Sequence, residues 1–305
     1  MDLFQAMKVF VKVAEAGSFS GAARALDMSN PSVTRHVADL ENYLHARLFN
    51  RSTRRLSLTE TGAAYLERCR QLLQDLEDAT LAAGMGAAKP VGTLRVNAPV
   101  SFAVNYLARV LPDYVRRYPQ VKLDITLSDR VVDLVEEGYD VAIRIMRAQE
   151  NSALVARQFA SARVLACAAP DYLQRHGTPR TPQELAQHVC LSYSYAATRD
   201  EWHFMRDGKT HTVRIKGALV ANNGDFLGAA AIAGMGVVQQ PSFIIGDAVR
   251  AGYLVPLLPE YSLPTLPIFA LYPSRQHLSA KVRTFVDFLV ERFAADPDWD
   301  RDLDN

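Results

Sequence analysis

Residues 30–35 carry side chains that can contact nucleic-acid bases, and they lie at the start of an amphipathic helical pattern. One side of this pattern is apolar, with residues at helical spacing at Val33, Val37, Leu40 and Leu44. The other side begins with small polar or compact residues and one arginine, at Asn30, Pro31, Ser32, Thr34 and Arg35. A guanidinium group can donate to guanine O6 and N7 together, and threonine or proline can pack on a thymine methyl. The first turn of this helix therefore suits the major groove of duplex DNA.

Two further groups near the N-terminus suit phosphate groups. Ser18 and Ser20 lie where a short helix begins, and exposed amides at a helix start bind anions. Arg51, Arg54 and Arg55 lie in a basic stretch, and they suit phosphates or a narrow minor groove. The alternatives are helix caps for the serines and solvated charges for the arginines. Residues 1–58 carry eight Lys and Arg side chains and five Asp and Glu side chains, so this segment is locally basic.

Three short helices and a hairpin are predicted to position these residues. Apolar residues from Leu3 to Ala14 recur at helical spacing, and Gly17 is a natural stop. A second helix follows, with Ser18 or Ser20 as its cap, and Ser29 and Pro31 open the third. The segments 47–49 and 56–58 are predicted to be short strands on either side of a basic tip, 50–55. Two helices, a tight turn and such a hairpin are typical of a winged helix-turn-helix.

A long helix is predicted next. Thr59 resembles an N-cap, and the helical pattern runs from Glu60 to about Ala83. Its apolar residues are spaced alternately by four and three, at Tyr65, Cys69, Leu72, Leu76, Ala79 and Ala83. This is a heptad seam, which fits either a helix packed on its own domain or a dimer-forming coiled coil. Residues 84–90 are interpreted as a hinge.

The remainder alternates strand and helix and predicts an α/β organisation with a mostly parallel sheet. Strands are expected at 93–97, 121–127, 141–145, 164–168, 189–193, 217–221 and 268–272. Helical patterns are expected around Phe102–Tyr118, Val131–Glu137, Phe226–Ala233 and Ala280–Phe293. A second unit of this kind spans about 163–265.

Polar and aromatic residues gather where these strands end, and a cleft between two α/β subdomains takes its ligand from such ends. The candidate ligand-binding residues are Ser101, Phe102, Ser128, Arg144, Tyr193, Tyr195, Asn222, Asn223 and Asp225. Arg144 and the free amides at a helix start suggest a ligand with a carboxylate. The alternatives are that Ser101 only caps its helix and that Arg144 only pairs with a nearby acid.

Composition excludes several classes of protein. The chain has 305 residues, 49% hydrophobic and 22% charged, which is ordinary for a globular protein of about two domains. The three cysteines include no CxxC pair, which disfavours a disulfide framework and a structural zinc site, and they read as small buried hydrophobes. No secretory signal or membrane span is recognisable, so a cytoplasmic protein is expected. No nucleophile elbow, phosphate loop or metal-ligand spacing supports catalysis, and no cofactor is expected.

These segments together resemble a known family. The run Val9–Gly62, with its pieces GSFSGAARAL, PSVTRHVADLE and LTETG, closely resembles the winged helix-turn-helix of LysR-type transcriptional regulators. Later, GTLRVNAPVSF, LPDYVRRYPQVKLDITLSDRVVDLVEEGYDVAIRI and GMGVVQQPSF resemble the effector-binding domain of that family. The resemblance covers about residues 9–293.

The resemblance implies a domain plan and a function. A winged helix-turn-helix would occupy residues 1–58, a linker and dimerisation helix with its hinge 59–90, and an effector-binding domain 91–305. That domain would resemble periplasmic binding proteins, with subdomain I at about 91–162 and 266–293, subdomain II at about 163–265, and two chain crossings. Positions 30, 31, 34 and 35 would read bases, and the strand ends would hold a small-molecule effector.

The partners implied are double-stranded operator DNA, the effector, a homodimer or homotetramer formed through the linker helix and effector domains, and RNA polymerase. No membrane partner is expected. Effector binding would bias subdomain closure and so alter the DNA complex. The alternative is an α/β enzyme or solute-binding protein with an accessory helical N-terminus, which would keep its activity after deletion of residues 1–58.

Overall fold

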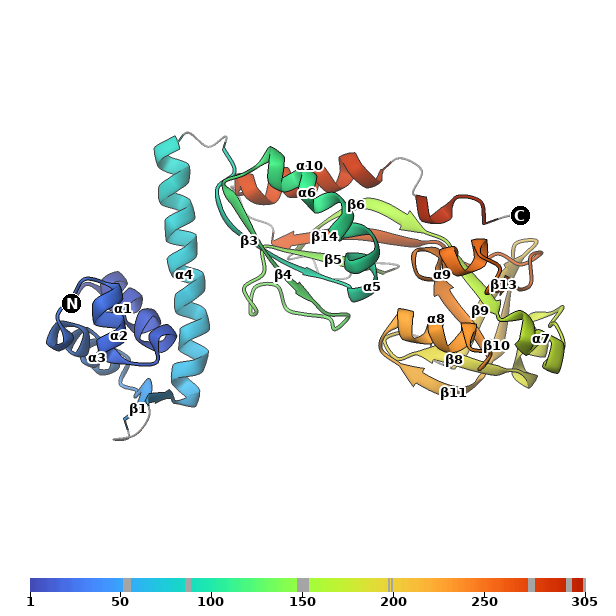
Figure 1. Ribbon diagram of the computed structural model, residues 1–305, viewed down its shortest axis with the longest axis horizontal. Helices are drawn as coiled ribbons and strands as arrows, with labels where there is room; N and C mark the ends of the chain where they lie inside the picture. Colours follow the sequence, from blue (N-terminus) through green and yellow to red (C-terminus); the bar gives the residue numbers. More distant parts are fainter. Residues whose placement is uncertain are drawn as a thin grey trace. The chain divides into compact units, whose positions relative to one another are not determined.

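The computed structural model describes residues 1–51, 56–85, 89–146, 154–196, 198, 200–273, 278–294 and 298–303. The chain divides into two compact units (Figure 1). Unit 1 comprises Met1–Thr93 with Val135–Gly138, and unit 2 comprises Leu94–Leu134 with Tyr139–Asn305. Among the described residues, no helix is long and apolar enough to cross a membrane.

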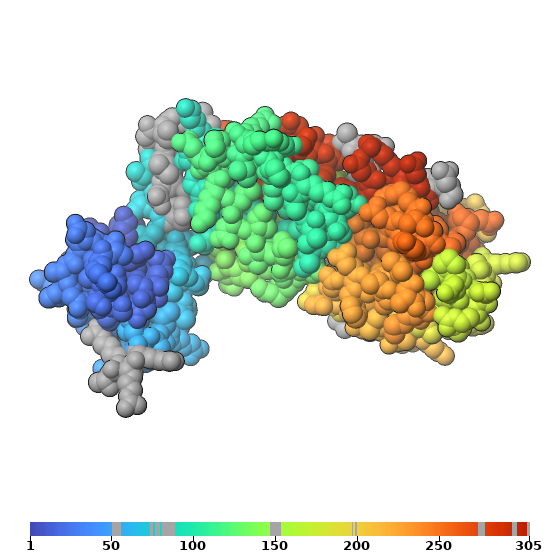
Figure 2. Space-filling view, viewed as in Figure 1, coloured from blue at the N-terminus to red at the C-terminus, as the bar shows by residue number. Residues whose placement is uncertain are grey.

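Unit 1 begins with three helices around one core, α1 (Leu3–Ala16), α2 (Phe19–Ala25) and α3 (Asn30–Leu44). Asp2, Ser18 and Ser29 cap the three helix starts, each side chain accepting from an amide three residues later. Gly17 ends α1 with a φ of +63°, a conformation that favours glycine. The three predicted helices are therefore confirmed, and they pack as one rounded body, blue in Figure 2.

The hairpin that follows consists of β1 (Phe49–Arg51) and β2 (Leu56–Leu58), paired antiparallel. The prediction that the first strand covers 47–49 is wrong by two residues. The backbone there is bound elsewhere, because the Leu48 amide donates to Glu41 Oε1 at 2.8 Å and the Arg47 carbonyl accepts from the Thr59 hydroxyl at 2.7 Å. The hairpin tip, residues 52–55, lies outside the described residues.

The long helix α4 (Glu60–Met85) is confirmed, and it continues two residues into the predicted hinge. Thr59 caps it, since its hydroxyl accepts from the Gly62 amide at 2.8 Å. The predicted seam changes character along the helix. Cys69 is fully buried in the core of unit 1, whereas Leu72 and Leu76 are 48% and 38% exposed. Leu72 and Leu76 therefore present apolar side chains to solvent in the single chain.

Unit 2 contains two five-stranded sheets. The order in the first is β4 (Val121–Leu127), β3 (Gly92–Ala98), β5 (Val141–Ile145), β14 (Leu266–Pro273) and β6 (Leu154–Ala162). The order in the second is β11 (Lys216–Ala221), β8 (Val189–Tyr193), β12 (Val237–Pro241), β7 (Val164–Ala168) and β13 (Val255–Pro256). The chain crosses from the first sheet to the second between β6 and β7 and returns between β13 and β14 (Figure 1).

Both sheets are mixed, so the prediction of a mostly parallel sheet is wrong. β3 runs parallel to β5, and β8 runs parallel to β11 and β12. β14 is antiparallel to both β5 and β6, and β7 is antiparallel to both β12 and β13. The two strands that run antiparallel to their neighbours, β7 and β14, are each the first strand after the chain crosses from one sheet to the other. Residue spacing places a strand but does not give its direction.

Helices cover both sheets of unit 2. One continuous helix contains α5 (Val100–Phe102), a π-helical turn (Ala103–Leu107) and α6 (Ala108–Arg117), close to the predicted 102–118. The others are α7 (Pro170–His176), α8 (Gly224–Ile232), α9 (Ser242–Arg250) and α10 (Ala280–Phe293). Short 3₁₀ turns cover Pro182–Gln187 and Asp298–Asp300. The sequence reasoning missed the hairpin of β9 (Glu201–Arg206) and β10 (Lys209–Arg214).

The predicted helix at Val131–Glu137 is wrong. This segment is a turn, closed by the Tyr139 amide donating to the Leu134 carbonyl at 2.9 Å. Val132 and Leu134, two residues apart, are buried against the sheet, whereas Val131 is exposed. Alternate residues are buried in an extended segment, whereas a helix would bury residues three or four apart. The same apolar residues fit both patterns in the sequence, and the helix prediction chose the wrong one.

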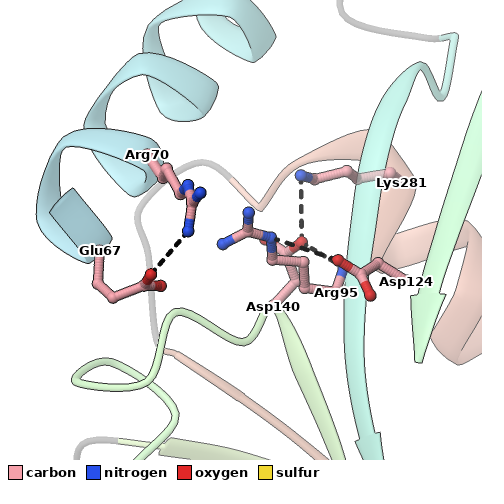
Figure 3. Close-up of polar contacts among 6 residues, drawn as sticks. All are labelled: Glu67, Arg70, Arg95, Asp124, Asp140 and Lys281. Carbon is pink, nitrogen blue, oxygen red and sulfur yellow. Dashed lines mark hydrogen bonds and ion pairs between the residues drawn. The ribbon is translucent and has the colours of Figure 1, made fainter. Parts of the chain in front are cut away.

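Ion pairs lie beside the first sheet of unit 2 (Figure 3). Lys281 of α10 is 4% exposed, and its ammonium group lies 3.2 Å from an Asp140 carboxylate oxygen. The same oxygen accepts from the Arg95 amide at 2.9 Å, and Arg95 also pairs with Asp124. Buried lysines are rare unless paired, so Asp140 compensates the charge that α10 brings into the interior. In unit 1, Glu67 and Arg70 form a separate pair on α4 at 2.8 Å.

The three cysteines, Cys69, Cys167 and Cys190, are free and buried, as predicted. Cys167 and Cys190 lie on β7 and β8, on either side of β12, so their backbones are about 10 Å apart at two strand spacings. A disulfide needs about 4.4–6.8 Å between Cα atoms, so this pair does not cross-link without backbone movement.

Burial raises the pKa of all three thiols, to about 11 for Cys69 and about 12 for Cys167 and Cys190. We therefore expect negligible alkylation of the native chain by iodoacetamide at pH 8, because the thiolate is the reactive form. Denaturation in urea should make all three cysteines react. Intact-mass spectrometry counts the added groups, and rapid labelling of the folded chain would contradict the burial described above.

Candidate nucleic-acid interface and ligand site

The first turn of α3 presents the predicted base-reading residues on its outer side. Val33, Val37 and Leu40 are fully buried against the core of unit 1, which turns the opposite side of the helix outward. Asn30, Pro31 and Arg35 are exposed, and Ser32 and Thr34 are half-buried. The α3 sequence therefore places all five predicted residues on or near one accessible helix end.

Two of these side chains have defined partners. The Thr34 hydroxyl donates to the Asn30 carbonyl at 2.9 Å, which leaves its methyl group as the outward apolar feature. The Arg35 side chain is 83% exposed, and its Nε lies 4.0 Å from an Asp39 oxygen one turn later. An exposed pair at this distance contributes little to stability, so the guanidinium group remains available to a partner.

The remaining predicted DNA contacts comprise one helix cap, one exposed serine and three arginines whose side chains the structure does not describe. Ser18 accepts from the Gly21 amide at 3.1 Å, so it caps α2 as the alternative interpretation had it. Ser20 is exposed in the first turn of the same helix. Arg51 lies in β1, opposite Leu56. The side chain of Arg51, together with Arg54 and Arg55, lies outside the described residues.

Glu41 fixes α3 to the hairpin, and sequence reasoning missed it. Its Oε1 accepts from the Leu48 amide at 2.8 Å and from the Phe49 amide at 3.2 Å. The Leu48 carbonyl in turn accepts from the Thr59 amide at 3.0 Å, just before α4. One carboxylate near the end of α3 is thus connected through Leu48 and Thr59 to the start of α4, so this network fixes the C-terminal part of α3 to the hairpin and the linker helix.

In unit 2, the predicted ligand residues collect around Asp129, which sequence reasoning did not single out. The Ser128 amide donates to the Ala98 carbonyl at 2.9 Å, which brings the end of β4 beside the end of β3. Asp129 Oδ1 then accepts from the Val100 amide at 3.1 Å, at the start of the helix that contains Ser101. Asp129 therefore occupies the helix start at which a ligand anion was expected.

Charges from two other elements act on Asp129. Burial raises its pKa and the Val100 amide lowers it, while the charge of Asp225 raises it and that of Arg144 lowers it. Arg144 is 9% exposed, and its guanidinium group donates to the carbonyls of Ile143 at 2.7 Å and Arg130 at 3.4 Å. Burial raises the pKa of Tyr193, and the Asp129 charge raises it further. The charges of Arg144 and Asp225 thus act on Asp129, and the charge of Asp129 acts on Tyr193.

The other predicted ligand residues have more varied positions. Tyr195 is half exposed, and its ring meets that of Tyr193 edge-on at 5.8 Å between centroids. Asn223 caps α8 by accepting from the Phe226 amide at 2.8 Å, and Asn222 before it is exposed. Asp225 accepts from Asn105 Nδ2 at 3.4 Å. This contact joins the helix of the first subdomain to the start of α8 in the second.

Ser101 and Phe102 lie inside unit 2. Ser101 is buried and does not cap its helix, whose preceding residue is Pro99 with no side-chain cap. Phe102 is fully buried among the rings of Phe159, Phe243, Phe293 and Trp299. The structure gives Phe102 no surface to present to a ligand, and it is a core residue of unit 2.

A pocket of about 410 Å³ lies elsewhere in the second subdomain and contains none of the predicted ligand residues. It is lined mainly by the start of α7, the turn after α8 and Tyr253. In the part of the chain that the structure describes, no three His, Cys, Asp or Glu side chains come together as a metal ion would require.

Comparisons with known proteins find matches for both the N-terminal and the C-terminal part of the chain. Residues 4–63 match the family described as "Bacterial regulatory helix-turn-helix protein, lysR family", and residues 87–294 match the "LysR substrate binding domain". An HTH-type transcriptional repressor of Pseudomonas aeruginosa (strain UCBPP-PA14) is 36% identical over 300 residues, 98% of this chain and 94% of the relative. The HTH-type transcriptional activator AaeR of Escherichia coli (strain K12) is 32% identical over 96% of this chain and 94% of the relative.

Among solved structures, the chain is similar to CrgA, a LysR-type transcriptional regulator from Neisseria meningitidis. The identity is 35%, the TM-score is 0.60, and the match covers 94% of this chain and 98% of CrgA. The relatives are matched over almost their whole length, so the similarity extends through both the helix-turn-helix and the α/β domain.

Proposed function

The chain belongs to the LysR family of DNA-binding transcriptional regulators, and on that premise we propose how its residues divide the work of reading an operator and sensing an effector. The family binds DNA through the helix-turn-helix and effectors through the substrate-binding domain, and it is a family of regulators and not of enzymes. A regulator acts where the chromosome lies, so the proposed location is the cytoplasm.

We propose that the first turn of α3 enters the major groove. The observation that supports this most directly is the exposure of Arg35 beside a fully buried stripe on the same helix. Arg35 would donate to one guanine, and Pro31 and the Thr34 methyl would pack on thymine methyls. Asn30 is shorter than the glutamine more common there, and it would contact a neighbouring base or phosphate.

Phosphate contacts are proposed for the edges of this surface. Ser20 and the amides at the start of α2 would bind one strand, with Ser18 and Ser32 beside them. The hairpin arginines Arg51, Arg54 and Arg55 would bind phosphates or the minor groove. The proposed domain plan keeps residues 1–58 for DNA, 59–90 for the linker and 91–305 for the effector.

We propose that the active form is a homodimer or a tetramer built from dimers. The exposed Leu72 and Leu76 of α4 support a linker-helix interface, because apolar residues at heptad spacing are buried when two helices pair. Two-fold symmetry predicts a partly palindromic operator with half-sites on one face of the duplex. RNA polymerase is the proposed partner at the promoter.

The test of this function is titration of the full chain with fluorescent DNA from upstream of its own gene. Neutralised phosphates release counterions, so log K should fall linearly with log salt, by about 0.9 per phosphate contact. A flat salt response, or equal affinity for unrelated DNA, would contradict sequence-specific binding.

Replacing Arg35 by alanine should relax specificity at one base-pair position. We expect a loss of about 1–3 kcal/mol for the cognate site and little loss for sites already changed at that position. Arg35→Lys is the matched control, because it keeps the charge and loses the two-pronged donor, so non-specific affinity should remain while discrimination falls. Competition binding against single-base operator variants measures both, and an unchanged base preference would remove Arg35 from the reading role.

The effector is proposed to bind around Asp129, among Ser128, Arg144, Tyr193, Tyr195, Asn222, Asn223 and Asp225, with Ser101 and Phe102 supporting the site from below. Closure of the two subdomains on the effector would shift DNA affinity. Such coupling is about 1–3 kcal/mol and reciprocal, so operator DNA should also change effector affinity. The carboxylate effector suggested by sequence depended on Arg144 and on free helix-start amides. Arg144 and the first of these amides, that of Val100, are both engaged within the chain.

A further inference from the structure

The start of the helix Val100–Arg117 is an anion position that the chain fills with its own carboxylate. Helix starts attract anions because their first amides have no partner within the helix. Here the Val100 amide donates to Asp129 Oδ1 at 3.1 Å. Asp129 reaches this amide because the Ser128 amide is hydrogen-bonded to the Ala98 carbonyl at the end of β3. A ligand carboxylate would have to displace Asp129 or lie beside it.

Among the described residues, the charges that act on Asp129 do not offset a second negative charge. Asp225 acts on Asp129 as a like charge, and it is itself held by Asn105 at 3.4 Å. Arg144 is the cation that acts on Asp129, but its guanidinium group is buried and already donates to the Ile143 and Arg130 carbonyls. The charge of one engaged guanidinium thus acts on Asp129 together with that of a second carboxylate, and a further carboxylate there would be repelled.

Apart from the buried guanidinium of Arg144, the described charged groups at this centre are the carboxylates, and beside them lie aromatic faces and neutral polar side chains. An ionised carboxylate accepts hydrogen bonds and does not donate them. The rings of Tyr193 and Tyr195 meet edge-on beside this centre, and Tyr195 is half exposed. Aromatic faces attract cations and pack on flat apolar groups.

We propose that Asp129 is the residue that sets effector class, excluding carboxylates and selecting a ligand whose facing group is a hydrogen-bond donor such as an ammonium, amide or hydroxyl group. This inference rests on the proposed effector site but not on the DNA interface. Its consequence is that loss of Asp129 opens the helix start to small carboxylates that the natural chain rejects.

The test compares thermal shifts of the full chain with sodium benzoate, benzylamine hydrochloride and sodium chloride at equal ionic strength. Benzoate and benzylamine share a ring for the tyrosine pair and differ in the sign of the attached charge. The variants are Asp129→Ala, which removes both the charge and the occupant of the amide, and Asp129→Asn, which removes the charge and keeps an acceptor oxygen. Glu201→Gln is the control, since it removes one exposed carboxylate on β9, outside the site.

We expect benzoate to have no effect on the natural chain or on Glu201→Gln beyond that of chloride. Its affinity should rise at least about tenfold in Asp129→Ala, because charge-assisted hydrogen bonds become available. Asp129→Asn should gain less, and benzylamine should lose affinity in both Asp129 variants. Should Asp129→Ala not fold, the Asp129→Asn comparison decides.

Two results would overturn the proposal. One is benzoate binding equally to the natural chain and to the folded Asp129 variants, and the other is folded Asp129 variants that gain no benzoate affinity. Operator binding is measured separately by fluorescence anisotropy with the natural chain. A natural chain that does not bind its operator would contradict the proposed DNA interface. The benzoate results for the Asp129 variants would still decide this proposal.

Discussion

Replacing Gly62 with alanine is expected to abolish operator binding. A Cβ at position 62 would overlap the Leu48 backbone carbonyl, and it would also lie within 3.1 Å of the Leu48 Cα. The obstacle is backbone rather than a flexible side chain, so the segment before β1 must move. Overpacking costs about 1–3 kcal/mol and more when backbone blocks the new group, and we expect the upper end or beyond.

The damage should reach α3 because Leu48 is a junction. Its carbonyl accepts from the Thr59 amide, and its amide donates to Glu41 on α3. Displacing Leu48 therefore disturbs the presentation of Arg35 as well as the hairpin. DNA affinity by fluorescence anisotropy and limited proteolysis of the N-terminal domain are the measurements. Thr61→Ala, an exposed neighbour in the same turn, should change stability by no more than about 0.5 kcal/mol.

A Gly62→Ala chain with natural operator affinity would contradict this account. It would mean that the contact between α4 and Leu48 relaxes at no cost to α3. Loss of binding by both Gly62→Ala and Thr61→Ala would also contradict it, because the effect would then belong to the helix turn and not to the missing side chain.

Trp299→Ala should destabilise unit 2 by about 3–5 kcal/mol, the range for truncating a buried tryptophan. Trp299 is 1% exposed, and its ring packs against Phe102, Tyr106, Phe243 and Phe293. Its indole Nε1 donates to the Ser161 carbonyl at 3.0 Å. The next residue, Asp300, accepts from the Arg163 amide at 3.2 Å and from the Ser242 hydroxyl. These contacts place the C-terminal turn beside the crossing from β6 to β7.

Urea unfolding followed by far-UV circular dichroism measures this effect. Trp299→Phe is the matched control, because it keeps a ring and loses the indole donor. It should lower the free energy of unfolding by about 0.5–1.5 kcal/mol for the lost hydrogen bond, and by somewhat more because the ring is smaller. Equal urea midpoints for Trp299→Ala and the natural chain would show that the ring cluster does not support the fold.

The caps and buried stripes of unit 1 were predictable because they depend on local chemistry. Ser29 followed by Pro31 marks a helix start through a side-chain oxygen and a fixed φ, and both effects act within one turn. Gly17 marks a helix end because it adopts a positive φ without strain. These signals need no knowledge of the rest of the chain.

Features that depend on distant partners were not predictable. Asp129 is one acid after one strand, and only the meeting of β3 and β4 brings it to the Val100 amide. Glu41 lies on the polar side of α3, where its two amide donors cannot be inferred from spacing. Trp299 sits in an acidic C-terminal stretch that resembles a solvated tail, and its burial depends on four rings from three other segments.

The predicted ligand residues show the same division. Tyr193 ends β8 and Asp225 follows the carboxyl end of β11, and these are neighbouring parallel strands, so strand spacing could place both residues at one edge. Arg144 lies on β5 in the other sheet, and strand spacing alone does not bring it there. Burial direction was not available from spacing, so Phe102 could not be separated from its neighbours as a core residue. The hairpin β9–β10 was missed although Asp207-Gly208, at its turn, is a recognised signal, because the flanking residues are largely polar.

The position of β14 between β5 and β6 has a consequence during synthesis. Both neighbours are made long before residues 266–273 leave the ribosome. At about 5–20 residues per second, the roughly 120 residues between β5 and β14 take several seconds to translate. For that interval two sheet edges have no partner, and unpaired edges promote association between nascent chains. Slow translation or a shortage of chaperones should therefore lower the soluble yield of the full chain more than that of residues 1–93 alone.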